Sequence, residues 1–164
     1  MVNGCCLTVA SIDDVFVSFD VINETLRISN LNNLCQGDMV NIERAAKINN
    51  EVGGHLMSGH VMTTAKIHEI NKSDNSYVLW LKIKDVDKMK YIFHKGFIGI
   101  DGISLTVGNI FERFFCIFLI PETLNRTTIG QKSLGYCTNI EVDSNTQVVV
   151  HTVERLLSLK KMLL

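Results

Sequence analysis

Two hydroxyl side chains lie two residues apart near the end of the segment Lys95–Val107 (KGFIGIDGISLTV). Successive side chains of a strand point to opposite faces, so Ser104 and Thr106 would share one face while Ile103 and Leu105 share the other. Two hydroxyls placed in this way can hydrogen-bond one polar heterocycle. Ordinary alternation of polar and apolar residues gives the same spacing, so the spacing alone leaves both interpretations open.

A second group of chemically capable residues occupies Gly53–His60 (GGHLMSGH). The two glycines before His55 permit unusual backbone angles, and Gly59 would let a ligand approach the chain closely. His55 and His60 are five residues apart, so they would not share a helix face, and no cysteine or carboxylate accompanies them. We therefore predict no metal site here.

The cysteines do not indicate a metal or redox site either. There are five of them, an odd number, and none forms a C-x-x-C pair. We expect them to be small buried apolar residues in a reducing compartment. They are Cys5, Cys6, Cys35, Cys116 and Cys137.

The chain contains a repeat of itself. Asn3–Ala45 aligns without a gap onto Asp101–Asp143, at an offset of about 98 residues and with about 14 of about 43 positions identical. The polar residues at the first site persist in the repeat, because Thr8 matches Thr106 and Cys6 matches Ser104. A packed core does not require polar positions to survive duplication, so the repeat favours a functional interpretation of these residues.

The two copies are not equivalent. Asp143 ends the second copy, whereas the first copy ends in Ala45, so the copies would not do identical work. A long segment, about residues 49–100, precedes the second repeat, but only Met1-Val2 precedes the first. We expect an incomplete first domain at residues 1–47, a complete second domain at 48–146 and a C-terminal segment at 147–164.

The composition predicts a mostly β protein. Short runs rich in β-branched and aromatic residues are separated by turn residues such as Asn32-Asn33, Gly53-Gly54 and Asp74-Asn75, a pattern typical of closed barrels. Short helices are expected near Glu24–Leu26, Pro121–Leu124 and Asp85–Phe93. The strands are expected at 5–12, 15–22, 39–45, 60–70, 77–84, 96–102, 103–110 and 114–120.

The C-terminal segment Gln147–Leu164 has an apolar stripe opposite charged residues, which predicts an amphipathic helix. Docking on the chain's own barrel and self-association are both open for this stripe. A net charge of −1 without a basic block argues against nucleic acid as a partner. The chain has neither a run of about 18 apolar residues nor a secretory signal, so we expect no membrane span and a cytoplasmic location.

The strings NGCCLTV, GGHLMSGHV, KGFIGIDGISLTVG, IPETLNRTTIG and NIEVD resemble the alpha-chain type of riboflavin synthase, and together they cover the chain to about Glu154. The resemblance implies an all-β fold of tandem six-stranded Greek-key barrels related by duplication, with the first one incomplete here. It also implies a C-terminal α-helix that helps to build a homotrimer.

The resemblance implies a transferase without a metal or redox cofactor. Two molecules of 6,7-dimethyl-8-ribityllumazine would exchange a four-carbon unit and yield riboflavin and 5-amino-6-(ribitylamino)uracil, at an active site between two subunits. The physical tasks are to orient two rings and to move protons. By position, the residues implicated in catalysis are Ser104, Thr106, Asp143, His60 and Lys95.

The ligand contacts that the resemblance implies come from both copies, and Gly59–Val61 and Leu119–Leu124 would contribute mainly backbone groups. They are Cys6, Leu7, Thr8, Asp20, Val21, Ile22, Asn23, Glu24, Thr25, Gly59, His60, Val61, Lys95, Ser104, Leu105, Thr106, Leu119, Ile120, Pro121, Glu122, Thr123 and Leu124.

The chain departs from the family at its start. Family members begin with Met-Phe-Thr-Gly-Ile, whereas this chain begins MVNGCCL, so roughly 40 residues of the first barrel have no counterpart. We therefore expect low turnover from the chain as given and exposed strand edges in its first domain. The alternatives are a lumazine- or flavin-binding protein without catalysis and an inactive remnant.

Overall fold

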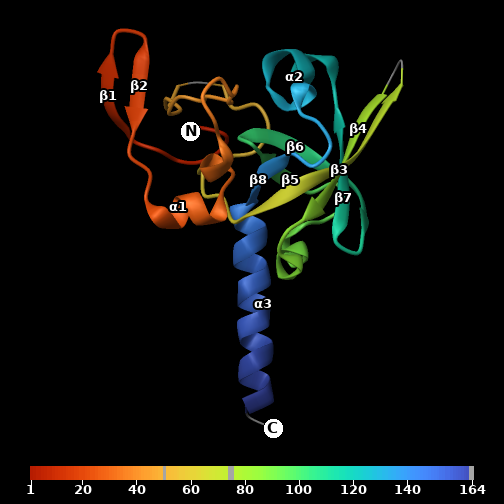
Figure 1. The fold of residues 1–164 in the computed structure, drawn as a ribbon. Helices are drawn as coiled ribbons and strands as arrows, with labels where there is room; N and C mark the ends of the chain where they lie inside the picture. The colour runs from red at the N-terminus through yellow and green to blue at the C-terminus, as the bar shows by residue number, and fades with distance from the viewer. Residues whose placement is uncertain (50, 74–75, 163–164) are drawn as a thin grey trace.

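The computed structural model describes residues 1–49, 51–73 and 76–162, so the expected turn at Asp74-Asn75 lies outside the described residues. Its main body is a closed antiparallel barrel in the strand order β3-β4-β7-β6-β5-β8 (Figure 1). This confirms the six-stranded barrel that the sequence predicts for the second copy. The strands are β3 (Thr63–Ser73), β4 (Ser76–Ile83), β5 (Phe97–Ile100), β6 (Ile103–Phe111), β7 (Phe114–Leu119) and β8 (Cys137–Val142).

The barrel closes around alternating apolar side chains. On β4, Leu79, Leu81 and Ile83 are fully buried, while Lys82 between them is exposed. Phe115 and Ile117 of β7 meet them from the neighbouring strand, with Leu79 opposite Ile117 and Leu81 opposite Phe115. The period of two is what places one face of each strand in the core. The expected helix at Asp85–Phe93 is a 3₁₀ helix, η2 (Val86–Tyr91).

The first copy repeats the second half of this barrel. Its hairpin of β1 (Val9–Asp13) and β2 (Phe16–Phe19) pairs Asp13 with Phe16, as β6 and β7 pair Phe111 with Phe114. The helices also correspond: α1 (Asn23–Ile28) matches α2 (Pro121–Arg126), and η1 (Leu31–Asn33) matches η3 (Ile129–Gln131). Asp14 and Glu112 even share the same positive φ of 51° in the two hairpin turns. The duplication is therefore structural as well as sequential.

The first copy does not close into a barrel among the described residues, as expected. Its hairpin stands away from the barrel (Figure 1), and Phe16 is 73% exposed, whereas its equivalent Phe114 is half-buried. Val9 is 46% exposed, but its equivalent Val107 is fully buried. The equivalent positions carry apolar residues that pack only where the surrounding strands are present.

The strand expected at residues 39–45 is wrong as a regular element. This stretch forms only an isolated bridge between Ile42 and Val2, which matches the pairing of Ile140 with Ile100 in the second copy. In the second copy the equivalent strand β8, which the sequence analysis missed, pairs with β3 on one side and β5 on the other. A strand needs hydrogen-bonding neighbours, and residues 39–45 have only Val2 and its surroundings.

The two copies meet through a network of buried polar groups that obeys an approximate two-fold symmetry. Asn41 donates from Nδ2 to the carbonyl oxygen of Asp101 (2.9 Å), and its equivalent Asn139 donates to the carbonyl oxygen of Asn3 (2.8 Å). Asn41 Oδ1 accepts from the Thr128 N–H (2.9 Å), and Asn139 Oδ1 accepts from the N–H of Asn30 (2.6 Å). These paired bonds satisfy backbone groups that burial would otherwise leave unpaired.

Two glycines let the copies come this close. Gly4 and Gly102 occupy equivalent turns with φ values of 77° and 81°. A Cβ on Gly4 would lie 2.6 Å from the backbone nitrogen of Gly102, and a Cβ on Gly102 would lie 2.9 Å from that of Gly4. Both positions therefore need glycine for backbone conformation and for space.

Among the described residues, the network contains one buried carboxylate. The Asp101 carboxylate, 1% exposed, accepts from Asn139 N–H (2.7 Å) and Asn30 Nδ2 (2.9 Å), and burial raises its pKa from 3.8 to about 7. The folded state therefore holds a proton between about pH 4 and pH 7 that the unfolded state has released. Stability from this group is present below pH 4, declines through that window and stays low above pH 7.

Replacing Asp101 by Asn, the residue at the equivalent position 3, should remove this pH dependence. A shift of one pKa unit corresponds to about 1.4 kcal/mol. The unmodified protein should therefore lose on the order of 1–3 kcal/mol of stability between pH 5 and pH 8 that the variant does not lose. Urea denaturation of both proteins at the two pH values measures the effect. If both proteins change stability equally between pH 5 and pH 8, the prediction is wrong.

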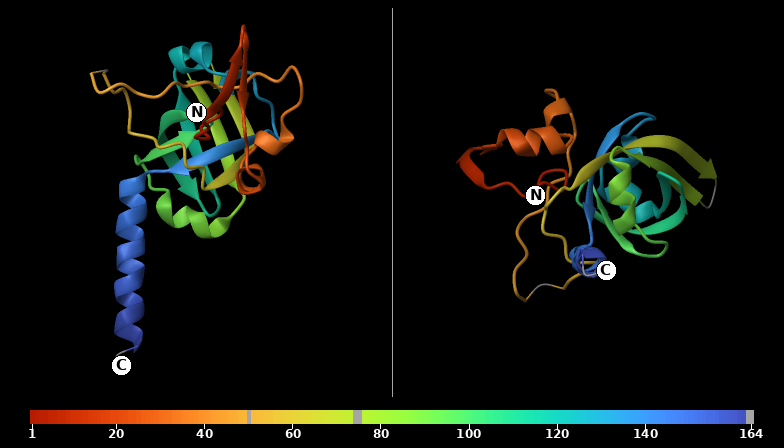
Figure 2. Two further views of the ribbon diagram at one scale, coloured as in Figure 1. Left: turned by 90° about the vertical axis from the view of Figure 1, so that its left-hand side faces the viewer. Right: turned by 90° about the horizontal axis from the view of Figure 1, so that it is seen from below.

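The C-terminal helix α3 (Ser144–Met162) starts three residues before the predicted boundary and projects away from the barrel (Figures 1 and 2). Its first part is tied to η2, because His151 Nε2 lies 2.5 Å from the Tyr91 hydroxyl and Glu154 pairs with Lys90 at 2.7 Å. Docking on the chain's own barrel therefore accounts for its start only. The apolar residues farther along are exposed: Val153, Leu156, Leu157, Leu159 and Met162.

Candidate functional site

The second copy places its predicted hydroxyls as the sequence indicates. Leu105 and Val107 of β6 are buried in the barrel, whereas Ser104 is half-buried and Thr106 is exposed on the outer face. Thr106 lies opposite Phe97 of β5. Lys95 just precedes β5 and donates its backbone N–H to Val107 (2.8 Å), with its side chain exposed beside the strand. These residues form a polar strip on the outside of the barrel.

The segment Leu119–Leu124 lies at the same end of the β6-β7 hairpin, because Val107 pairs with Ile117 and the strands run antiparallel. Leu119 is buried, whereas Ile120, Pro121 and Glu122 are exposed at the start of α2. Buried side chains cannot contact a ligand on the outer face. Leu105, Leu119 and Val61 are buried and can therefore contribute only backbone groups.

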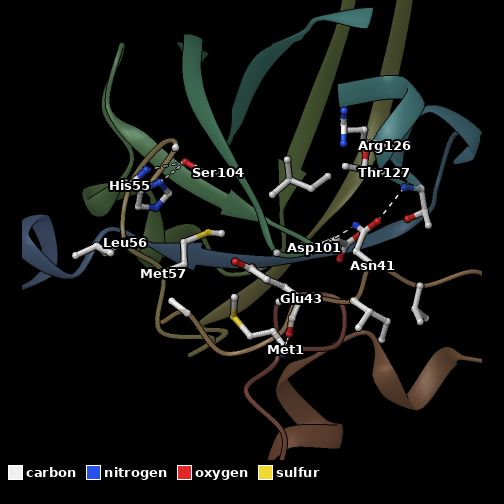
Figure 3. Close-up of a pocket in the computed structure, with 18 of the residues that line it drawn as sticks. Met1, Asn41, Glu43, His55, Leu56, Met57, Asp101, Ser104, Arg126 and Thr127 are labelled. Carbon is white, nitrogen blue, oxygen red and sulfur yellow. Dashed lines mark hydrogen bonds between the residues drawn. The ribbon is translucent and has the colours of Figure 1, made fainter. Parts of the chain in front are cut away.

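Ser104 is bound by a residue that the site prediction omitted. Its Oγ accepts the backbone N–H of His55 (3.0 Å) and lies 2.6 Å from Nδ1 of the same residue (Figure 3). The His55 ring stacks on Phe97, with centroids 5.1 Å apart and planes at 17°. Sequence analysis noted His55 only in the Gly53–His60 motif. Ser104 is 49 residues away along the chain, and no local sequence pattern predicts such a contact.

Two carboxylates act on this group. Burial lowers the pKa of His55, and the negative charges of Asp143 and Glu141 partly oppose that effect. Asp143 follows β8, and its Oδ2 accepts the backbone N–H of Thr146 (2.8 Å) at the start of α3. Capping of the C-terminal helix is the alternative to a catalytic role that the sequence leaves open for Asp143, because Asp143-Ser144-Asn145 are helix-starting residue types. One oxygen of Asp143 caps the helix, and the negative charge of this carboxylate acts to raise the pKa of His55.

The first copy contacts the Gly53–His60 motif at its third glycine, Gly59. The Gly59 carbonyl oxygen accepts the backbone N–H of Cys6 (2.8 Å). Glu141 holds the same turn from β8 by accepting the N–H groups of Ser58 (2.7 Å) and Gly59 (3.0 Å). The exposed His60 ring lies with Nδ1 2.7 Å from Ser58 Oγ. The structure therefore brings Gly59 to Cys6. Asp20–Thr25 lie at the open end of the β1-β2 hairpin, where Val9 pairs with Phe19, and at the start of α1.

A cavity of about 830 Å³ lies between the two copies, and it only partly coincides with the predicted site. Of the predicted residues only Ser104 lines it, together with His55, Met57 and Arg126 (Figure 3). Thr106, Lys95 and Leu119–Leu124 lie outside this cavity, on the open outer strip. Many of the residues that line the cavity belong to the loops at residues 39–46 and 51–57, whereas the strip is carried by strands of the closed barrel.

Among the residues that the structure describes, no group of three histidine, cysteine or acidic side chains is placed to hold a metal ion. No helix in the described part of the chain is long and apolar enough to cross a membrane. The five cysteines are free, but the expectation that they are buried holds only for Cys5 and Cys116, since Cys6 and Cys35 are exposed.

Comparison with known proteins finds similarity along nearly the whole chain. Residues 1–45 and 58–143 match the family model of the lumazine binding domain. The riboflavin synthase of Escherichia coli K12 is 59% identical over 159 residues, which are 97% of this chain and 75% of the relative. The riboflavin synthase of Chlamydia pneumoniae is 45% identical over 157 residues, 96% of this chain and 76% of the relative.

Solved structures agree with this likeness. The structure of LumP with 6,7-dimethyl-8-(1'-D-ribityl)lumazine superposes with a TM-score of 0.78 at 25% identity, covering 88% of this chain and 76% of that one. The complex of LumP with riboflavin gives a TM-score of 0.78 at 27% identity, with 88% and 77% covered. Those proteins hold their ligands on the fold that is found here.

Proposed function

We propose that this chain, which belongs to the riboflavin synthase family of lumazine-binding proteins, converts two molecules of 6,7-dimethyl-8-ribityllumazine into riboflavin and 5-amino-6-(ribitylamino)uracil. The observation that carries the proposal is the 59% identity to an Escherichia coli riboflavin synthase over 97% of the chain. The reaction is a transferase reaction, because a four-carbon unit leaves one lumazine and joins the other. Donor and acceptor are the same compound, so the atoms and electrons of the two products balance without an oxidant.

The polar strip suits the proton transfers that this exchange requires. Ser104 and Thr106 present hydroxyls on one face of β6, and the backbone of Lys95 is bonded to Val107 next to them. Asp143 follows β8, and His60 precedes β3. The exposed backbone around Ile120–Glu122 can hydrogen-bond the heterocycle of a bound ligand. Cys6 and Thr8, at the equivalent positions of the first copy, would face the second lumazine together with Gly59–Val61 and Asp20–Thr25.

Incubating the purified chain with the lumazine tests the reaction. Riboflavin and the aminouracil should appear in equal amounts, as separated by chromatography, while quenching of flavin fluorescence measures binding. A folded chain that binds the ligand saturably but releases no riboflavin would favour the alternative of a non-catalytic carrier. That alternative has one observation in its favour, the superposition on the LumP complexes, but at only 25–27% identity.

We further propose that the active chain is a homotrimer with a site between subunits. Two observations support this: the predicted strip is open to solvent in the single chain, and α3 exposes an apolar stripe beyond its contacts with η2. Apolar patches of this kind commonly mark association surfaces.

Sedimentation of the chain at micromolar concentration should therefore give the mass of three chains. Replacing both Leu156 and Leu157 of α3 by Asn should shift the chain to the monomer, because it removes apolar area that association would bury. Lys160→Ala, on the charged side of the same helix, is the matched control. A monomer for the unmodified chain would contradict the proposal.

A further inference from the structure

We infer that His55 is a positioning residue of the second-copy site, which holds the Ser104 hydroxyl in the orientation that proton transfer needs. The inference rests on the proposed function, and it assigns a role to the part of the Gly53–His60 motif that this function leaves unused. The short loop at residues 53–60 would then contact the site residues of both copies.

Two glycines of this loop, Gly54 and Gly59, occupy equivalent places in the two copies. Gly59 has φ 78°, and a Cβ on it would lie 2.7 Å from both Cβ and N of Cys6. Gly54 has φ 86°, and a Cβ on it would lie 2.4 Å from Oγ of Ser104. Because Cys6 and Ser104 are equivalent residues, each copy has a left-handed glycine pressed against the same position of its strip.

A histidine follows each glycine. His60 follows Gly59 and is among the residues that the family resemblance places near the reacting rings, and His55 follows Gly54 in the same way. The two Gly-His pairs are therefore counterparts, one for each copy, although they lie five residues apart in a single loop.

At Ser104, Oγ accepts the His55 backbone N–H at 3.0 Å and lies 2.6 Å from Nδ1. We assign the hydroxyl proton to the short bond with Nδ1. Nδ1 can accept it only when the ring is neutral and carries its proton on Nε2. The stacking on Phe97 fixes the ring plane. Backbone and ring together thus allow the Ser104 hydroxyl one orientation.

The far nitrogen of the ring lacks a hydrogen-bond partner in the part of the chain that the structure describes. His55 Nε2 is buried and makes no hydrogen bond among the described residues. A buried N–H without an acceptor is costly, and an oxygen or ring nitrogen of a bound ligand would satisfy it. The ring therefore faces the Ser104 hydroxyl with one nitrogen, and the other has no partner among the described residues.

The charges around the ring determine how this arrangement depends on pH. Glu141 of β8 and Asp143 before α3 face it, and Glu51, Glu43 and Arg126 line the same cavity. Burial nevertheless lowers the pKa of His55, so the ring is neutral at pH 7. Below its pKa, a proton on Nδ1 would reverse the hydrogen bond and turn the Ser104 proton away.

Three variants test the role. Asn at position 55 keeps an oxygen acceptor close to the place of Nδ1, whereas Leu keeps the bulk without any acceptor. His55→Leu should lower kcat about ten- to a hundredfold with KM changed less than about threefold, since misplaced groups cost rate more than binding. His55→Asn should stay within about threefold of the unmodified chain and lose the acid limb of the pH profile. His68→Leu, on the far exposed part of β3, is the control and should change neither quantity.

Thermal melts accompany the kinetics. If His55→Leu keeps the normal rate and pH profile, or if the Leu and Asn variants lose rate equally, His55 does not position Ser104. The ring state is also measurable without turnover, by ¹⁵N NMR of the histidine side chains. A neutral Nε2–H tautomer that changes in Ser104→Ala supports the inference even if no riboflavin forms, which would count against the proposed function alone. An Nδ1–H tautomer, or a spectrum unaffected by Ser104→Ala, would overturn it.

Discussion

Replacing Ser104 by Ala should lower the rate constant for riboflavin formation about a hundredfold, with ligand affinity nearly unchanged. General acid or base assistance by a positioned group typically contributes about 10²–10⁴-fold, and Ser104 is the strip residue whose hydroxyl is held by two contacts from His55. Binding is shared among many backbone groups of the strip, so the loss of one hydroxyl should affect it little. Single-turnover kinetics separates the chemical step from binding and product release.

The competing interpretation is that Ser104 is a structural hydroxyl that anchors the loop at residues 53–57. In that case Ser104→Ala would lower the melting temperature while the activity of each folded molecule stayed near normal. Ser133→Ala, in an exposed turn outside the site, controls for the assay. A rate loss below about threefold in a well-folded Ser104→Ala protein would remove this residue from the mechanism.

The repeat in the sequence was the most informative local signal. It correctly predicted equivalent helices at Glu24 and Glu122 and a complete barrel in the second copy, because identical letters at a fixed offset specify the same local conformations. It failed at residues 39–45. Those residues have the pattern of a strand, but only their equivalents in β8 have β3 and β5 as neighbours. A segment with strand propensity forms a regular strand only where neighbouring strands are present to pair with it.

In the candidate site, too, local features could be predicted from the sequence and long-range contacts could not. The outward direction of Ser104 and Thr106 follows from the period of two along β6, which is a local rule. The His55–Ser104 and Gly59–Cys6 contacts join segments that are distant along the chain. These contacts depend on how the loop at residues 53–60 packs between the two copies, and residue spacing along the chain does not determine that packing.

The polar junction between the copies offers the other large effect. Asn139→Ala should cost on the order of 3–6 kcal/mol, because it leaves the carbonyl oxygen of Asn3 and both the N–H and Oδ1 of Asn30 buried without their partner. Each orphaned buried group costs about 1–3 kcal/mol. The loss should fall on the attachment of the first copy, since the barrel core of β3–β8 does not contain these groups.

Two probes distinguish detachment from global unfolding. Trp80 is the only tryptophan and lies on β4, so its fluorescence reports the barrel, whereas limited proteolysis within residues 9–19 reports the first copy. In Asn139→Ala the hairpin should become cleavable at denaturant concentrations that leave Trp80 unchanged. The equivalent variant Asn41→Ala, which breaks two such bonds in a less buried setting, should show the same order of events with a smaller loss. Asn71→Ala, exposed on β3, should alter neither probe. If Asn139→Ala loses less than about 1 kcal/mol, or if both probes change together, the two-fold polar network is not what holds the copies to each other.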